Sequence, residues 1–212
     1  MTLERISLAE LERDALTEIV NIGVSRAASS LRKMIGDQVL LSVPSIEVVS
    51  QNRAARLISE REVSDLVAVR QDFAGPFSGR ALLIFPETNS LELVRAVTGG
   101  ELTPQEVLEM EGEALSETGN VILNACLATM ANMLQRSLTM TIPEVLRGTS
   151  AHLFEVDPAG PGGGLVLFLY IDFAVRSRDI RGYIAMIMDI PSLETLKELL
   201  DEFITRVVGD DV

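Results

Sequence analysis

The sequence is poor in the residue types from which many functional sites are built. Its 212 residues include one cysteine, Cys126, and one histidine, His152. A single cysteine excludes an internal disulfide and a cysteine-cluster metal site, and a single histidine cannot form a histidine metal site. We therefore interpret Cys126 as a small buried residue of an apolar helix and His152 as a strand residue without a chemical role.

Clustered positive charge and long apolar runs are also missing. The net charge is −13 and no dense basic patch offsets it, which argues against nucleic-acid binding, because that needs grouped lysines and arginines. No stretch reaches the roughly 18 apolar residues of a membrane span. The N-terminal residues carry charges from Glu4 onward and no apolar signal core. These features predict a cytoplasmic protein.

Two segments of unusual composition are interpreted as connections. The run Gly160–Gly164 has four glycines but lacks the lysine and the strand–helix context of a phosphate-binding loop. We expect Pro158–Gly164 to be a hairpin loop. The acidic stretch Glu101–Glu113 is expected to be a solvated linker, with a docking role as the open alternative.

Aliphatic residues dominate what remains. The chain is 47% hydrophobic with only 4% aromatic residues, which is enough for an aliphatic core. Helical periodicity predicts two long helices, Ser7–Ile35 and Glu111–Leu138. Shorter patterns predict strands at 39–43, 66–69 and 80–85 with a helix at 89–97, and later strands at 140–142, 152–156, 165–173 and 183–190 with a closing helix at 192–208.

These elements repeat along the chain. A unit of helix, strand and proline recurs at an offset of 99, and the fragment from Gly79 to Glu92 resembles that from Gly182 to Glu194. Such internal similarity indicates a duplicated structure. We expect a single α+β domain of two repeats, about 7–100 and 106–209, related by an approximate two-fold axis. The two long helices should lie side by side on one face of a β-sheet.

A polar motif occupies the same place on both long helices. Asp14, Glu18 and Asn21 follow the pattern D-x3-E-x2-N, and 22 residues separate Asn21 from Pro44. In the second helix Glu113, Glu117 and Asn120 follow E-x3-E-x2-N, and 22 residues separate Asn120 from Pro143. If each fixed residue type has a frequency of about 5%, the Glu-x2-Asn-x22-Pro core arises by chance at roughly one in 8,000 positions.

The spacing places the motif on one face of each helix. At about 100° per residue, these positions fall within a stripe about 60° wide. A solvated helix face is the ordinary explanation for such a stripe. However, asparagine is a poor helix former, and here it fills the same slot twice. We therefore expect accessible glutamate and asparagine side chains without internal cationic partners.

The two motif blocks resemble the signature [DS]-x3-E-x2-N-x22-P of the CheC, CheX and FliY group of chemotaxis phosphatases. CheC is the most similar member, through Glu18-Ile19-Val20-Asn21-Ile22-Gly23 and Glu117-Thr118-Gly119-Asn120. Glu113 departs from the signature, which has Asp or Ser at that position. This departure favours the first site as the stronger one.

The resemblance implies an enzyme that hydrolyses the aspartyl phosphate of a CheY-like response regulator. Asn21 and Asn120 would orient the attacking water, and Glu18 and Glu117 would pair with the receiver's lysine. Asp14, Glu113, Pro44 and Pro143 would support these two sites. The resemblance implies no cofactor in this chain, because the Mg²⁺ is carried by the receiver domain. The CheD deamidase is a further partner of the family. A non-catalytic scaffold related to flagellar switch proteins, or a CheD-binding regulator, is the alternative.

Overall fold

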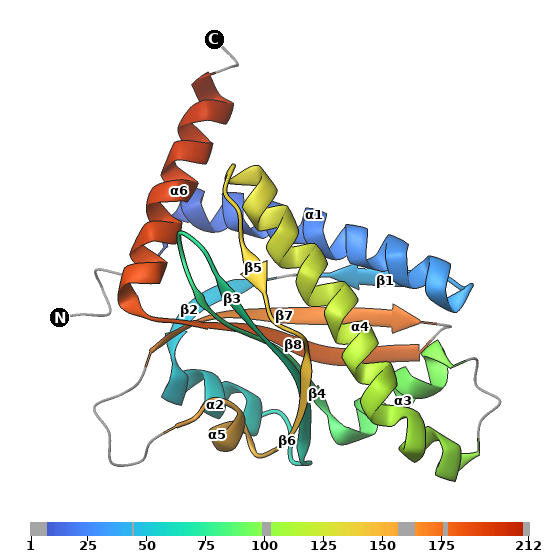
Figure 1. The fold of residues 1–212 in the computed structure, drawn as a ribbon. Coiled ribbons are helices and arrows are strands. Elements are labelled where there is room, and N and C mark those ends of the chain that lie inside the picture. Colours follow the sequence, from blue (N-terminus) through green and yellow to red (C-terminus); the bar gives the residue numbers. More distant parts are fainter. Residues whose placement is uncertain (1–7, 44, 99–102, 157–163, 176–177, 210–212) are drawn as a thin grey trace.

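The computed structural model describes residues 8–43, 45–98, 103–156, 164–175 and 178–209. These residues form three layers, with one antiparallel sheet between two sets of helices (Figure 1). The larger aliphatic core lies between the sheet and the long helices, and a smaller core lies on the opposite face. The expected α+β architecture is confirmed.

The order of elements is the same in the two halves of the chain. The first half contains α1 (Glu10–Ile35), β1 (Val39–Ser42), β2 (Ile46–Ser50), α2 (Gln51–Ser59), β3 (Leu66–Ala74), β4 (Gly79–Pro86) and α3 (Glu87–Val97). The second half contains α4 (Pro104–Met133), β5 (Thr139–Met140), β6 (Glu144–Gly148), α5 (Ser150–Leu153), β7 (Leu165–Val175), β8 (Arg178–Met188) and α6 (Ile190–Gly209). We retain the division into two repeats as an interpretation of this doubled order.

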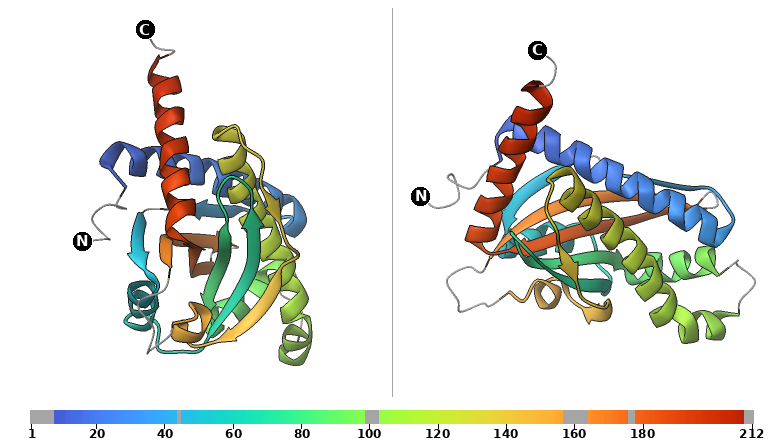
Figure 2. Two further views of the ribbon diagram at one scale, coloured as in Figure 1. Left: turned by 60° about the vertical axis from the view of Figure 1, so that its left-hand side comes forward. Right: turned by 45° about the horizontal axis from the view of Figure 1, so that its top comes forward.

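The sheet joins the two halves at its centre and again near both edges. Its order is β1-β7-β8-β4-β3-β5, with β2 also on β7 and β6 also on β3. The central pair β4 and β8 is antiparallel, from Arg80 opposite Ile187 to Ile84 opposite Tyr183. The first-half strands β1 and β2 therefore pair with β7 of the second half. The second-half strands β5 and β6 pair with β3 of the first half (Figure 2).

The two long helices cross on one face of the sheet at a glycine (Figure 2). A Cβ atom on Gly23 would lie 2.9 Å from the Cα of Cys126 and 3.2 Å from the carbonyl oxygen of Ala125. The helix backbones are thus too close for a larger residue at this point. Cys126 is fully buried, and burial raises the pKa of its thiol to about 12, so its interpretation as a small core residue is confirmed.

Buried carboxylates hold the N-terminal parts of both long helices in place. The Glu12 carboxylate accepts a 2.7 Å hydrogen bond from the backbone N–H of Ala9, and it lies 3.7 Å from Nζ of Lys197 on α6. Glu111, 99 positions later, pairs with Arg147 and accepts a 2.9 Å hydrogen bond from the Ser90 hydroxyl. Helix α1 is thereby attached to α6, and α4 to α3 and β6.

Four expectations from the sequence require correction or fall outside the described residues. Helix α4 begins at Pro104, capped by Thr103, so most of the stretch Glu101–Glu113 is helix instead of linker. His152 lies in the short helix α5 and not in a strand, because Thr149 caps a helical turn there. The expected start of the first helix at Ser7 and the hairpin loop at 158–163 lie outside the described residues.

The glycine at the helix crossing provides a test of this packing. Gly23→Ala should lower the free energy of unfolding by about 1–3 kcal/mol, because the new methyl group meets helix backbone instead of a flexible side chain. Gly112→Ala in α4 is the matched control. It meets no atom within 4 Å and should raise stability by about 0.5–1 kcal/mol through helix propensity. Urea unfolding of both variants would measure the difference, and equal effects would contradict the close crossing.

Candidate functional site

The motif residues of α1 form an exposed strip beside a shallow groove. Asp14, Glu18 and Ser25 are exposed, and Asn21 is partly exposed. The groove has a volume of about 350 Å³ and is lined by Glu18, Asn21, Ile22, Ser25, Arg26 and Ser29. We refer to this strip and groove as the first site. Its surface is accessible to another protein, as the sequence predicted.

The carboxamide of Asn21 is held by the backbone at the end of β1. Its Oδ1 accepts a 3.1 Å hydrogen bond from the N–H of Val43, and its Nδ2 donates to the carbonyl oxygen of Val43 at 3.4 Å. Val43 lies between β1 and β2 and immediately precedes Pro44, which lies outside the described residues. The spacing of 22 residues between asparagine and proline thus has a structural explanation in the first half.

The motif residues of α4 occupy the equivalent face of the second long helix. Glu113 and Glu117 are exposed, and Asn120 and Asn124 are partly exposed. We refer to this strip as the second site. Neither Glu18 nor Glu117 takes part in an ion pair among the described residues. The two glutamates are therefore accessible to another protein in this part of the chain.

Asn120 is held by side chains instead of backbone. Its Oδ1 accepts hydrogen bonds from Nδ2 of Asn124 at 2.6 Å and from Nε2 of Gln71 at 3.2 Å. Gln71 also donates to the carbonyl oxygen of Thr141 at 3.0 Å. The residue corresponding to Val43 is Ile142, which precedes Pro143 and is 86% exposed, whereas Val43 is 2% exposed. The two sites therefore share a motif but differ in what supports it.

Two sequence differences between the halves contribute to this contrast. Asn124 stands where the first helix has Ser25, and a buried strand residue also differs. The sequence Gln71-Asp72-Phe73-Ala74 on β3 recurs as Ile171-Asp172-Phe173-Ala174 on β7. Gln71 and Ile171 are both buried and hold corresponding places in the two strands. Among the described residues, only the second site therefore has a polar side chain that reaches from the sheet to its asparagine.

Sequence reasoning missed two residues that contact these sites. Arg26 lines the groove of the first site, and its Nη1 donates to the hydroxyl of Thr129 on α4 at 3.3 Å. It lies about 80° around the helix from Glu18, outside the polar stripe, so the stripe gave no signal for it. Gln71 is a polar residue at a core-facing position of a strand, between Val69 and Phe73. Alternation along the strand would have identified it.

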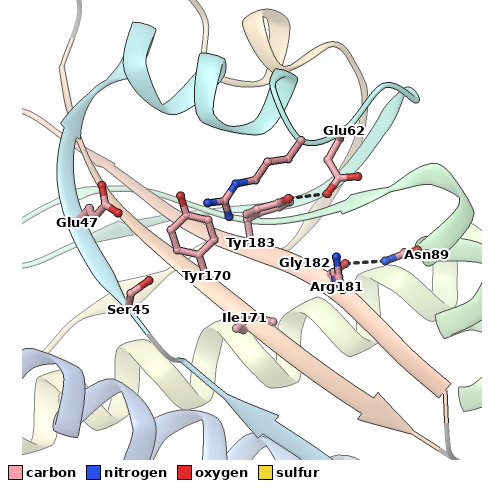
Figure 3. Close-up of a pocket in the computed structure, with 10 residues that line it drawn as sticks. Ser45, Glu47, Glu62, Asn89, Tyr170, Ile171, Arg181, Gly182 and Tyr183 are labelled. Atoms are coloured by element: carbon pink, nitrogen blue, oxygen red, sulfur yellow. Dashed lines mark hydrogen bonds between the residues drawn. The ribbon is translucent and has the colours of Figure 1, made fainter.

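A wider cleft lies on the face of the sheet that α2 covers (Figure 3). It has a volume of about 1020 Å³, and its lining includes residues of β2, β7 and β8. The hydroxyl of Tyr183 donates to Glu62 at 2.5 Å, and the guanidinium of Arg61 lies 4.3 Å from the centre of the Tyr170 ring. Burial, together with the bond to Glu62, raises the pKa of Tyr183. None of the motif residues lines this cleft.

Within the described residues, no group of three or more His, Cys, Asp or Glu side chains is arranged to hold a metal ion. No helix in the described ranges is both long and apolar enough to cross a membrane.

Comparison with known families supports the resemblance seen in the motifs. The model "Chemotaxis phosphatase CheX" matches residues 67–158, and the "CheC-like family" model matches residues 11–48. In these two segments the chain is similar to the CheX and CheC-like families. The CheC-like match contains the first motif and the CheX match contains the second, so both copies lie inside matched segments.

Two proteins with similar sequences are named CheC and FliY. The CheY-P phosphatase CheC of Bacillus subtilis is 23% identical over 197 residues, covering 89% of this chain and 93% of that protein. The flagellar motor switch phosphatase FliY of the same organism is 24% identical over 140 residues, covering 65% of this chain. This chain spans only 36% of that FliY protein.

Solved structures of the CheC, CheX and FliY group share the fold. FliY from Thermotoga maritima superposes with a TM-score of 0.73 at 17% identity, covering 92% of this chain and 98% of that one. CheX in a CheX–CheY–BeF3–Mg complex from Borrelia burgdorferi has a TM-score of 0.51 at 16% identity, covering 82% and 99%. The FliM middle domain from H. pylori has a TM-score of 0.54 at 11% identity, covering 91% and 99%.

The contacts of the motif residues predict how their substitutions affect folding. Asn21→Ala should lower the free energy of unfolding by about 1–2 kcal/mol, because Val43 loses its hydrogen-bond partners. Glu18→Ala removes an exposed side chain and should change stability by no more than about 0.5 kcal/mol. Chemical denaturation of both variants would measure this contrast. An Asn21→Ala protein as stable as the parent would show that the bonds to Val43 contribute nothing.

Proposed function

We propose that the protein hydrolyses the aspartyl phosphate of a CheY-like receiver domain, using the two sites on α1 and α4. The observation that carries the proposal is the doubled Glu-x2-Asn motif on exposed faces of two corresponding helices. It is supported by relatives named CheY-P phosphatase and by a CheX structure solved with CheY. Exposed motif residues suit this function, because they must enter the active centre of another protein.

In this proposal the asparagines position water. Phosphoryl transfer depends mainly on positioning and charge stabilisation, and a carboxamide can hold a water molecule without titrating near neutral pH. At the first site, the two bonds to Val43 leave Asn21 one N–H and one oxygen lone pair. These remaining groups are enough to orient a water molecule toward the phosphorus of the receiver.

Glu18 and Glu117 would fix the receiver in register. Both carboxylates are exposed and no cation within the described residues competes for them, so each is available to pair with the lysine of a receiver's active site. Such an ion pair is not required to take up a proton. The magnesium ion in this reaction is part of the substrate, bound by the receiver domain.

A non-catalytic scaffold is the second candidate, and one observation favours it. The bonds between Asn21 and Val43 give this asparagine a structural role that does not require catalysis. The similarity to the FliM middle domain shows that the fold is shared with a protein of the flagellar switch. Binding of a CheD-type deamidase remains a proposal of the same kind, for which no contact in the structure selects a surface.

Kinetic measurements on the asparagine variants distinguish these candidates. Asn21→Ala and Asn120→Ala should each slow dephosphorylation of a labelled phospho-receiver with Mg²⁺, and the double variant should lose nearly all acceleration, roughly a hundredfold or more. Water positioning requires the carboxamide, so the effect should appear mainly in kcat. We expect the first site to contribute more, because Glu113 departs from the family signature.

The glutamate variants serve as a comparison within the same assay. Glu18→Ala and Glu117→Ala should weaken receiver binding and raise KM, with a stronger dependence on ionic strength in the parent than in the variants. Circular dichroism must show that every variant is folded. A folded double asparagine variant that still accelerates decay like the parent would exclude the proposed mechanism and favour the scaffold.

A further inference from the structure

A buried glutamine lies beneath the second site. Gln71 is 1% exposed and points from β3 toward α4, on the same face of the strand as Val69 and Phe73. Its Oε1 has no hydrogen-bond partner among the described residues. A buried acceptor without a partner opposes folding, so stability alone does not explain a glutamine at this position.

The hydrogen bonds of Gln71 determine the orientation of its carboxamide. Its Nε2 lies 3.0 Å from the carbonyl oxygen of Thr141, and a carbonyl oxygen can only accept. The nitrogen end of Gln71 must therefore face Thr141. Because this same nitrogen also lies 3.2 Å from the Asn120 carboxamide, the atom that Asn120 turns toward the sheet must be its oxygen.

Asn124 completes the arrangement. Its Nδ2 donates to the same Oδ1 of Asn120 at 2.6 Å, and its own Oδ1 lies 3.5 Å from Nε2 of Gln71. The two lone pairs of the Asn120 oxygen are thus occupied. Its Nδ2 has no partner among the residues that the structure describes. Asn120 therefore presents hydrogen-bond donors, whereas Asn21 retains both a donor and an acceptor.

We propose that Gln71 is a positioning residue of the second site, which holds Asn120 so that its side-chain N–H groups face the receiver. This inference rests on the proposed function. In it, Asn120 donates a hydrogen bond to the oxygen of the attacking water, and the other lone pair of that water faces the phosphorus. Gln71 itself touches neither water nor receiver and acts only through Asn120.

The experiment isolates the second site by using the Asn21→Ala variant as the background. Adding Gln71→Met there preserves side-chain length but removes the donor. The kcat for phospho-receiver hydrolysis should fall roughly tenfold, with KM within about a factor of two, because the receiver-pairing carboxylate of Glu117 is unchanged. Ile171→Met, at the corresponding position of β7, is the matched control for placing a methionine at a buried strand position and should leave kcat in this background unchanged.

A second background tests whether Gln71 acts through Asn120. In the Asn120→Ala variant there is no carboxamide to position, so Gln71→Met should have no additional effect on kcat. As a readout independent of activity, the ¹⁵N side-chain amide signals of Asn120 should shift in Gln71→Met alone. The thermal unfolding midpoint should not fall by more than in Ile171→Met, because the change also removes an unpaired acceptor.

The outcomes separate this inference from the function on which it rests. An unchanged kcat in the Asn21→Ala background, or an equal loss in the Asn120→Ala background, overturns the role of Gln71 while leaving the two-site phosphatase in place. Unchanged Asn120 amide signals also overturn it. If the Asn21→Ala, Asn120→Ala double variant hydrolyses the phospho-receiver like the parent, the proposed function itself fails.

Discussion

The pairing of β4 with β8 is the contact on which the rest of the structure depends. It places the two halves of the chain in one continuous sheet, and it makes the strands on either side of it available to the opposite half. Because β1 and β2 pair with β7, and β5 and β6 pair with β3, neither half forms a complete sheet of its own. The long helices are brought to the same face as a consequence.

This arrangement explains why two similar motifs lie in different surroundings. The face of α1 with Asn21 lies beside the connection between β1 and β2. There the Asn21 side chain forms hydrogen bonds with the backbone N–H and carbonyl oxygen of Val43. The face of α4 with Asn120 lies above a strand that carries Gln71 in place of Ile171. The exposed motif is nearly symmetric, whereas the buried layer that orients it is not. Two sites with one chemistry can therefore differ in strength.

Much of the fold was predictable because its signals are local or repeated. The long helices show clear apolar periodicity, and the recurrence at an offset of 99 indicated the duplication. The prediction was wrong where tertiary contacts override local composition. The acidic residues before Glu113 looked like a linker, but Thr103 and Glu106 cap a helix whose Val107 and Glu111 are buried. The strand β6 was missed, and the turn at His152 is helical because of the cap at Thr149.

The site was predictable only in its exposed part. The spacing of Glu18 and Asn21 on one helix face follows from helix geometry. The contacts of Asn120 with Gln71 and Thr141 join residues that are distant in the sequence. Such contacts depend on strand register and helix position, which no local pattern specifies.

The exchange of strands between the halves also has a consequence for synthesis in the cell. Ile46 of β2 reaches its partner Leu169 only after most of the chain has left the ribosome. Until β8 and β6 arrive, β3 and β4 form a hairpin with two unpaired edges and apolar faces. Folding that relies on such distant pairings is slow, and exposed strand edges favour aggregation. The first half alone therefore exposes strand edges and apolar surface that only the second half covers.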